Sequence, residues 1–94
     1  DLISALNFSQ TFRKAALGNK YKQIDKNEYF EINKRPFAAY QFLGDNSLPG
    51  RVVVFRYGKY YFEVAAEFTG RKMLKSLQLE ELFQIQNSVL SSLN

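Results

Sequence analysis

The sequence predicts a single α+β domain in which an N-terminal and a C-terminal helix pack on one face of an antiparallel sheet of three to five strands. Two stretches near the chain ends carry apolar residues at helical spacing, which is typical of amphipathic helices. Between them, apolar and polar residues alternate with the period of a strand, most clearly in residues 60–68. The 94-residue length predicts one domain, residues 1–94. The abrupt start at Asp1 suggests a fragment or processed form of a longer chain.

The composition allows a packed core and excludes several kinds of chemistry. A hydrophobic fraction of 46%, with nine Phe and six Tyr, is enough for the chain to fold. The absence of Cys excludes a disulfide framework and thiolate metal ligands, and the absence of His removes the commonest general base and metal ligand. The net charge of +4 is typical of a mildly basic, solvated surface. No apolar run approaches the ~20 residues of a membrane span, and no signal peptide is visible.

The first predicted element is a helix over residues 2–17. Gly18 and Asn19 tolerate the left-handed conformation and are expected to end this helix. Phe8 lies off its main apolar stripe. The stripe consists of Leu2, Leu6, Phe12 and Ala16, with Ala5, Ala15 and Leu17 beside it.

Residues 20–33 are predicted to be extended. Ile24, Phe30 and Ile32 share one parity and therefore one face. The polar residues 25–28 suit a turn or a bulge, so one long bent strand and two short strands both remain open. Residues 33–36 are predicted to form a turn, because Pro36 lacks the donor that a central strand needs.

Three further strands and a C-terminal helix complete the prediction. The strands cover residues 37–43, 51–57 and 60–68, with a loop at 44–50 and a tight hairpin turn at Gly58 and Lys59. In the last strand, Tyr60, Phe62, Val64, Ala66 and Phe68 are expected to face the core, and Tyr61, Glu63, Ala65 and Glu67 the solvent. Ser76 is expected to cap the final helix. Its apolar stripe consists of Leu79, Leu82, Phe83, Val89, Leu90 and Leu93, opposite Gln84, Asn87, Ser88 and Ser91.

No catalytic constellation is visible, so the sequence predicts a protein that is not an enzyme. Glu63 and Glu67 share a strand face but lie ~13 Å apart by strand rise, too far to act as a pair on one bond. No phosphate-binding glycine loop and no metal-ligand spacing occurs. We therefore expect no catalytic, cofactor-binding or metal-binding residues and no cofactor.

The best candidates for an interaction surface lie on the outer sheet face and in the loop at 44–50. Tyr61 and Ala65 are rather apolar for exposed positions, and tyrosine is common at interfaces. The competing explanation is that these side chains only cover an edge strand and bind no partner. Leu48 either anchors the loop or contacts a partner. The full candidate set is Leu48, Arg56, Lys59, Tyr61, Glu63 and Ala65.

Two alternative functions remain open, a nucleic-acid-binding module and a small ligand-binding domain. Basic and aromatic residues interleave in residues 51–61, an arrangement that can contact phosphates and stack bases. The spacing around Gly58 does not fit the RNA-recognition pattern. Further phosphate contacts would come from Lys20, Lys22, Lys34, Arg35, Arg56, Lys59, Arg71 and Lys72.

About 80 residues resemble the non-catalytic accessory domain that follows the catalytic domain in some bacterial Oma-like zinc metallopeptidases. The stretches that carry the resemblance are residues 12–18 (FRKAALG), 32–39 (INKRPFAA), 50–55 (GRVVVF), 57–62 (YGKYYF) and 87–90 (NSVL). The chain departs from the pattern at Lys34, where a glycine is usual, and at Val89, where a Phe often stands. More loosely, the chain is similar to the PsbP/DcrB/Mog-type α-β-α sandwich, although the N-terminal strand pair of the full fold is missing.

The resemblance implies a docking or regulatory domain in a bacterial cell-envelope protein, periplasmic or exported. The peptidase's HExxH helix is absent, so no peptidase activity is carried over. We therefore expect a non-catalytic interaction domain. It would bind another protein or domain through its sheet face, the loop at 44–50 or a groove between helix and sheet.

Overall fold

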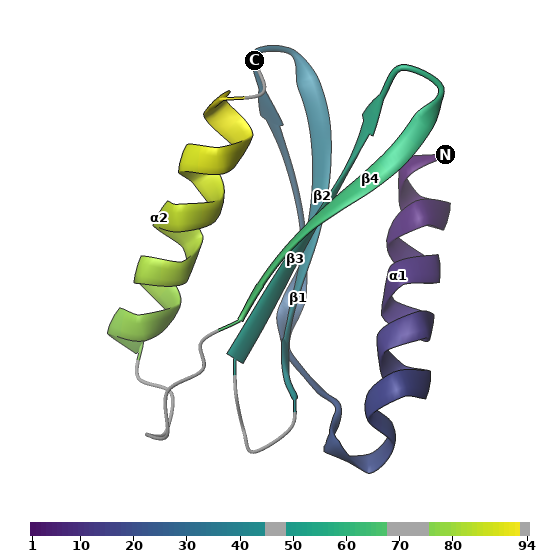
Figure 1. Cartoon of the computed structure of the whole chain (residues 1–94), viewed down its shortest axis with the longest axis vertical. Helices are drawn as coiled ribbons and strands as arrows, with labels where there is room; N and C mark the ends of the chain where they lie inside the picture. The colour runs from purple at the N-terminus through teal and green to yellow at the C-terminus, as the bar shows by residue number, and fades with distance from the viewer. Residues whose placement is uncertain (45–48, 68–75, 93–94) are drawn as a thin grey trace.

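The chain folds into a four-stranded antiparallel sheet with a helix at each end of the sequence (Figure 1). The computed structural model describes residues 1–44, 49–67 and 76–92. The strands lie side by side in sequence order, which confirms the predicted α+β class. The elements are α1 (Leu2–Leu17), a short 3-10 helix η1 (Gly18–Lys20), β1 (Lys22–Ile32), β2 (Arg35–Leu43), β3 (Pro49–Tyr57), β4 (Tyr60–Glu67) and α2 (Ser76–Ser92).

The two helices cover opposite faces of the sheet, so the prediction that both pack on one face is wrong. Leu6 of α1 packs with even-numbered residues of β2 and β3, such as Tyr40 and Val52. Leu90 of α2 packs with odd-numbered residues, such as Phe37 and Val53. Figure 1 shows the sheet between the helices. The reason is that the central strands are buried at consecutive positions, so both of their faces need a cover.

The hairpin turns are confirmed in place but not in every boundary. Gly58 has φ 66° in the two-residue turn between β3 and β4, as predicted. Asn33 and Lys34 alone, with φ 50° and 66°, form the turn between β1 and β2. The predicted turn at 33–36 was therefore too long. Pro36 belongs to β2, where it is tolerated because the pairing of β2 with β3 begins one residue later.

β1 is one strand with a bulge, which decides between the two predicted alternatives. Its register against β2 steps from Ile24 opposite Gln41 to Glu28 opposite Ala39. Asp25 has φ 64° within this step. Asn27 Oδ1 accepts hydrogen bonds from Gln10 of α1, at 2.9 Å, and from Gln23, at 3.1 Å. The bulge is thus held by a side chain of the covering helix.

The inner face of α1 differs from the predicted stripe. The helix begins with an Asp1 cap whose Oδ1 accepts from the Ser4 amide at 2.8 Å, and it ends at Gly18, with φ 57°, as predicted. Leu6 is buried, but Phe12 is 64% exposed. Ser9 is buried in place of an apolar residue because the sheet offers a polar partner there.

The predicted polar face of the C-terminal helix is confirmed, and its apolar stripe only in part. Leu90 is buried, whereas Val89 is 42% exposed and the polar Gln86 is buried beside Leu90. Gln84, Asn87, Ser88 and Ser91 are all exposed. The other residues of the stripe lie outside the side chains that the structure describes.

β4 shows the predicted alternation, and Tyr61, Glu63 and Ala65 are exposed as predicted, but the side expected to face the core is buried only in part. Val64 packs against the cluster beneath α2. Tyr60 and Phe62, on the same face, are largely exposed because the β3–β4 hairpin extends past the core. Glu63 is exposed as predicted and also bonds to Ser9 and Arg13 of α1. Phe68 lies outside the described residues.

Candidate functional site

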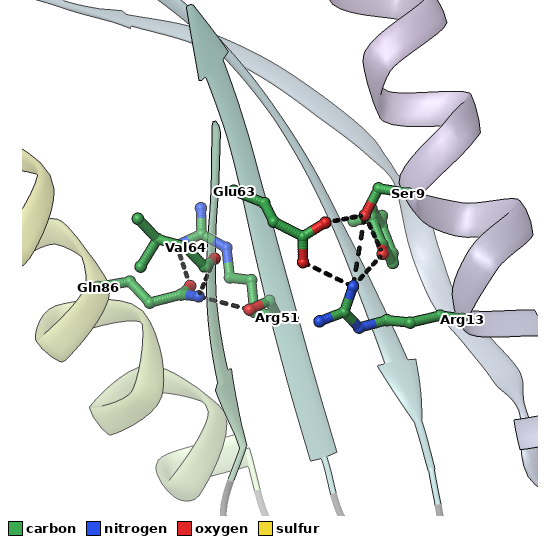
Figure 2. A network of polar contacts seen from close by, with 7 residues as sticks. Ser9, Arg13, Arg51, Glu63, Val64 and Gln86 are labelled. Carbon is green, nitrogen blue, oxygen red and sulfur yellow. Dashed lines mark hydrogen bonds and ion pairs between the residues drawn. The ribbon is translucent and has the colours of Figure 1, made fainter. Parts of the chain in front are cut away.

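A polar network joins α1 to the sheet (Figure 2). Arg13 Nη1 donates to Glu63 Oε2 at 2.7 Å, and Ser9 Oγ donates to Glu63 Oε1 at 2.9 Å. The Tyr40 hydroxyl lies 2.6 Å from Ser9 Oγ. Burial lowers the pKa of the Arg13 guanidinium, but the bond to Glu63 and the field of Tyr40 more than offset this and raise it. Both carboxylate oxygens of Glu63 are therefore engaged within the domain.

This network holds the helix on the sheet through side-chain bonds. Ser9 is buried, and its hydroxyl is bonded to Tyr40 and Glu63. Its carboxylate neighbour is committed to Arg13 by an ion pair and is not a free base. The arrangement instead fixes the position of α1 on β2 and β4.

A second network joins α2 to the opposite face of the sheet. Arg51 Nη1 donates to Gln86 Oε1 at 3.2 Å, and Arg51 Nη2 lies 3.3 Å from Glu28 Oε2. Gln86 Nε2 donates to the carbonyl oxygens of Arg51 and Val64. Gln41 donates to the other carboxylate oxygen of Glu28. Burial lowers the pKa of Arg51, and Glu28 offsets this only in part.

The sequence did not predict these two networks. Gln86 lies four residues before Leu90, so helical spacing places both on one face, and this spacing was the available signal. Arg51 begins the strand that the sequence predicts at 51–57 and is followed by three valines, and no local pattern distinguishes it from the other basic residues of 51–61. In the structure it is the buried cation to which α2 is attached.

Replacing Tyr40 by Phe should remove part of the alkaline sensitivity of the domain. Burial raises the pKa of the Tyr40 phenol above its ordinary value of 10.0, and its bonds to Ser9 and Arg13 only partly oppose this. Above about pH 10 the unfolded phenol therefore ionises first. The stabilisation of the folded state by the protonated Tyr40 phenol is complete below that pH and is lost as the pH rises through the pKa of the folded protein.

The measurement is urea unfolding of both proteins at about pH 8 and pH 11. At the lower pH we expect the variant to be less stable by about 1–2 kcal/mol, because buried partners lose a hydrogen bond. This difference should shrink at the higher pH. Tyr60→Phe, at an exposed position, is the control and should follow the wild type. A difference that grows with pH would contradict the assignment.

The structure brings three of the predicted interaction residues together and two more near them. Tyr61, Glu63 and Ala65 follow one another along the α1 face of β4. Arg56 stands opposite Tyr61 on β3, and its Nε donates to the Gly58 carbonyl oxygen at 2.9 Å. Lys59 lies exposed in the hairpin turn. Leu48 lies outside the described residues.

Apolar side chains of both helices flank this strand, which the sequence did not predict. Phe8 of α1, 75% exposed, lines a groove of about 180 Å³ with Tyr61 and Phe62. Val89 of α2 lines a groove of about 360 Å³ with Phe62 and Val64. Phe12 and Ile85 lie one helical turn from Phe8 and Val89 and continue these two flanks. We call the set Phe8, Phe12, Tyr60, Tyr61, Phe62, Ile85 and Val89 the β4 edge surface.

A larger groove, of about 520 Å³, lies at the start of α1. It is lined by Leu2, Ile3, Tyr29, Phe30 and Phe37, among others. None of the predicted interaction residues lines it. It is a groove between helix and sheet of the expected kind, but at the other edge of the sheet.

Among the described residues, the predicted phosphate contacts divide between the two ends of the sheet. Lys34, Arg35, Arg56 and Lys59 lie near the two hairpin turns, at one end of the sheet. Lys20 and Lys22 lie at the opposite end, where β1 begins. Arg71 and Lys72 lie outside the described residues.

Metal and membrane signatures are absent from the described part of the chain. No group of three or more acidic side chains there could hold a metal ion. Neither of its α-helices is long and apolar enough to cross a bilayer. Comparison of the chain with protein-family models, curated proteins and solved structures found no match.

Proposed function

We propose that the domain is a non-catalytic interaction domain that binds another protein through the β4 edge surface. The observation that supports this is the concentration of exposed apolar side chains along one strand and both flanking helices. Large exposed apolar patches on soluble domains usually mark sites of protein interaction. Tyrosine and phenylalanine are also enriched at such sites, whereas scattered lysines and glutamates are depleted.

The chemistry along β4 supports an apolar partner surface. Glu63, the central charge of the strand, is already paired with Arg13, so it does not demand a cation from the partner. Ala65, on the same face, is exposed, small and uncharged. An accessory or regulatory role in a bacterial cell-envelope protein follows from the resemblance described above and remains part of the proposal.

Photo-crosslinking from Tyr61 tests this proposal. Benzoylphenylalanine would replace Tyr61 on β4 or, as a matched control, Tyr29 on β1, in cells that make the protein naturally. Both tyrosines are exposed, at 40% and 57%, and both face the α1 side of the sheet. We expect a covalent adduct with a polypeptide from position 61 and little or none from position 29. Equal labelling at both positions, or none at either, would contradict the proposal.

A further inference from the structure

We propose that the partner at the β4 edge surface is a second copy of this chain. The two copies would pair β4 with β4 in antiparallel orientation and join their four-stranded sheets into one. This inference rests on the proposed interaction function and names its partner. It follows from a difference between the two sheet edges, from the backbone of β4, and from the area and chemistry of the exposed side chains.

The two edge strands of the sheet are not equally protected. β1 is interrupted by the bulge at Asp25 and carries exposed charges at Lys22, Lys26 and Glu31. Bulges and charges are the usual devices by which edge strands avoid pairing with another chain. β4 pairs with β3 without a register shift, its exposed side chains include Tyr60, Tyr61 and Phe62, and the charge of Glu63 is paired with Arg13. Among the described residues, no segment pairs with its outer edge.

The backbone of β4 offers a regular set of hydrogen-bonding groups. Tyr57 and Tyr60 flank a two-residue turn and therefore form a hydrogen-bonded pair, after which the pairs alternate. Even-numbered residues of β4 thus bond to β3. The amide and carbonyl groups of Tyr61, Glu63 and Ala65 point to the outer edge, where another strand can reach them.

The strand is complementary to itself in one register. A two-fold axis perpendicular to the sheet keeps each side chain on its own face, so only registers that pair residues of equal parity are allowed. Centred on Val64, this axis places Phe62 opposite Ala66 and Glu63 opposite Ala65. Large side chains then meet small ones, and no like charges stand directly opposite each other.

The exposed area is close to what a stable dimer needs. An aromatic side chain presents about 200 Å² of surface, so the exposed fractions of the five aromatic residues correspond to about 600 Å². Ile85 and Val89 bring the total toward the ~800 Å² per partner of a standard protein interface. A single bound peptide strand would leave much of this surface uncovered, because the surface lies on both faces of the sheet.

Both helices are placed to cover the line along which the two β4 strands would pair. Phe8 and Phe12 from each α1 would meet on one face of the joined sheet, and Ile85 and Val89 from each α2 on the other. Residues 84–92 of α2 contain no charged side chain, so two such helices can approach without repulsion. A second copy supplies apolar cover on both faces at once.

Sedimentation equilibrium of the 94-residue chain over about 1–500 μM tests the proposal, since a standard interface of this size gives Kd values at or below the micromolar range. We expect a dimer for the wild type and for Tyr29→Lys on the β1 edge. Tyr61→Lys, or Ala65→Lys at a second exposed position, should weaken association at least tenfold with an unchanged far-UV circular dichroism spectrum. A wild type that stays monomeric throughout, or a dimer indifferent to both β4 variants, would overturn the inference.

A single cysteine tests the register, because the chain contains none of its own. Val64 would stand opposite itself in a non-hydrogen-bonded pair, whose Cα atoms lie ~4.5 Å apart, within the range of a disulfide. Val64→Cys should therefore form a covalent dimer under mild oxidation, and Tyr29→Cys should not. If the chain proves monomeric while photo-crosslinking at position 61 captures a different polypeptide, the dimer fails and the proposed function stands. If nothing is captured, both fail.

Discussion

Phe42→Ala should lower the free energy of unfolding by about 3–5 kcal/mol, which is a large part of the 5–15 kcal/mol that stabilises a typical domain. Phe42 is buried beneath α1 and stacks on Tyr21 with ring centroids 5.6 Å apart. The Arg13 guanidinium lies 5.8 Å from the centre of its ring. Removing the ring leaves a cavity that these neighbours fill only in part. The loss is measured by urea unfolding.

The effect of removing the Phe42 ring should depend on the residue at position 50. Gly50 stands opposite Phe42 in the sheet, and a Cβ added to it would lie 2.5 Å from Phe42 Cζ. Gly50→Ala should therefore cost about 1–3 kcal/mol in the wild type through overpacking. In the Phe42→Ala background the same methyl group enters the vacated space, so the substitution should be neutral or stabilising.

The double-mutant cycle measures this coupling directly. We expect an interaction energy of about 1–3 kcal/mol, because the two residues share one volume. Gly44→Ala is a useful comparison, since its Cβ would lie 3.3 Å from the same ring and needs only a small adjustment. Additive effects of Phe42→Ala and Gly50→Ala would show that the ring does not occupy the space above Gly50.

Gln86→Ala should detach α2 from the sheet, with a loss of about 2–4 kcal/mol, because a buried polar group that loses its bond costs about 1–3 kcal/mol and more than one group is affected. The Gln86 side chain accepts a hydrogen bond from Arg51 and donates to two backbone carbonyl groups. Its removal leaves these groups without that partner. The buried Arg51 cation adds to the loss because Glu28, the carboxylate paired with it, is partly exposed.

Gln84→Ala provides the matched control, since it changes the same residue type in the same helix at an exposed position. This variant should stay within about 0.5 kcal/mol of the wild type. Hydrogen exchange of the amides at 84–92 provides a local readout and should accelerate only in Gln86→Ala. Equal stability of the two variants would show that the buried network does not attach α2.

Most of the secondary structure was predictable because it depends on local pattern. The predicted helix at 2–17 coincides with α1, and the final helix, which Ser76 was expected to cap, begins at Ser76 itself. Gly58 and Gly18 adopt the positive φ that their positions suggested. The strand boundaries erred where proline or glycine continues a strand, as at Pro36 and Pro49, because only the neighbouring strand decides whether a donor is needed there.

The candidate site was predictable only along β4. The period of two in this strand is enough to place Tyr61, Glu63 and Ala65 on one face. Phe12, in contrast, was expected on the buried stripe of its helix and is exposed. Its position depends on how far α1 is rotated about its axis, and the bonds of Ser9 and Arg13 to Tyr40 and Glu63 set that rotation.

The sequence by itself determined the type and order of the elements, the hairpin turn at Gly58 and the absence of His and Cys chemistry, whereas the number of strands was left at three to five. These depend on periodicity, turn residues and composition, all of which are local. The tertiary structure alone decided that the helices lie on opposite faces of the sheet and that both present apolar side chains beside β4. Such placement depends on which strands become central and so need cover on two faces, and that is settled only when the strands pair.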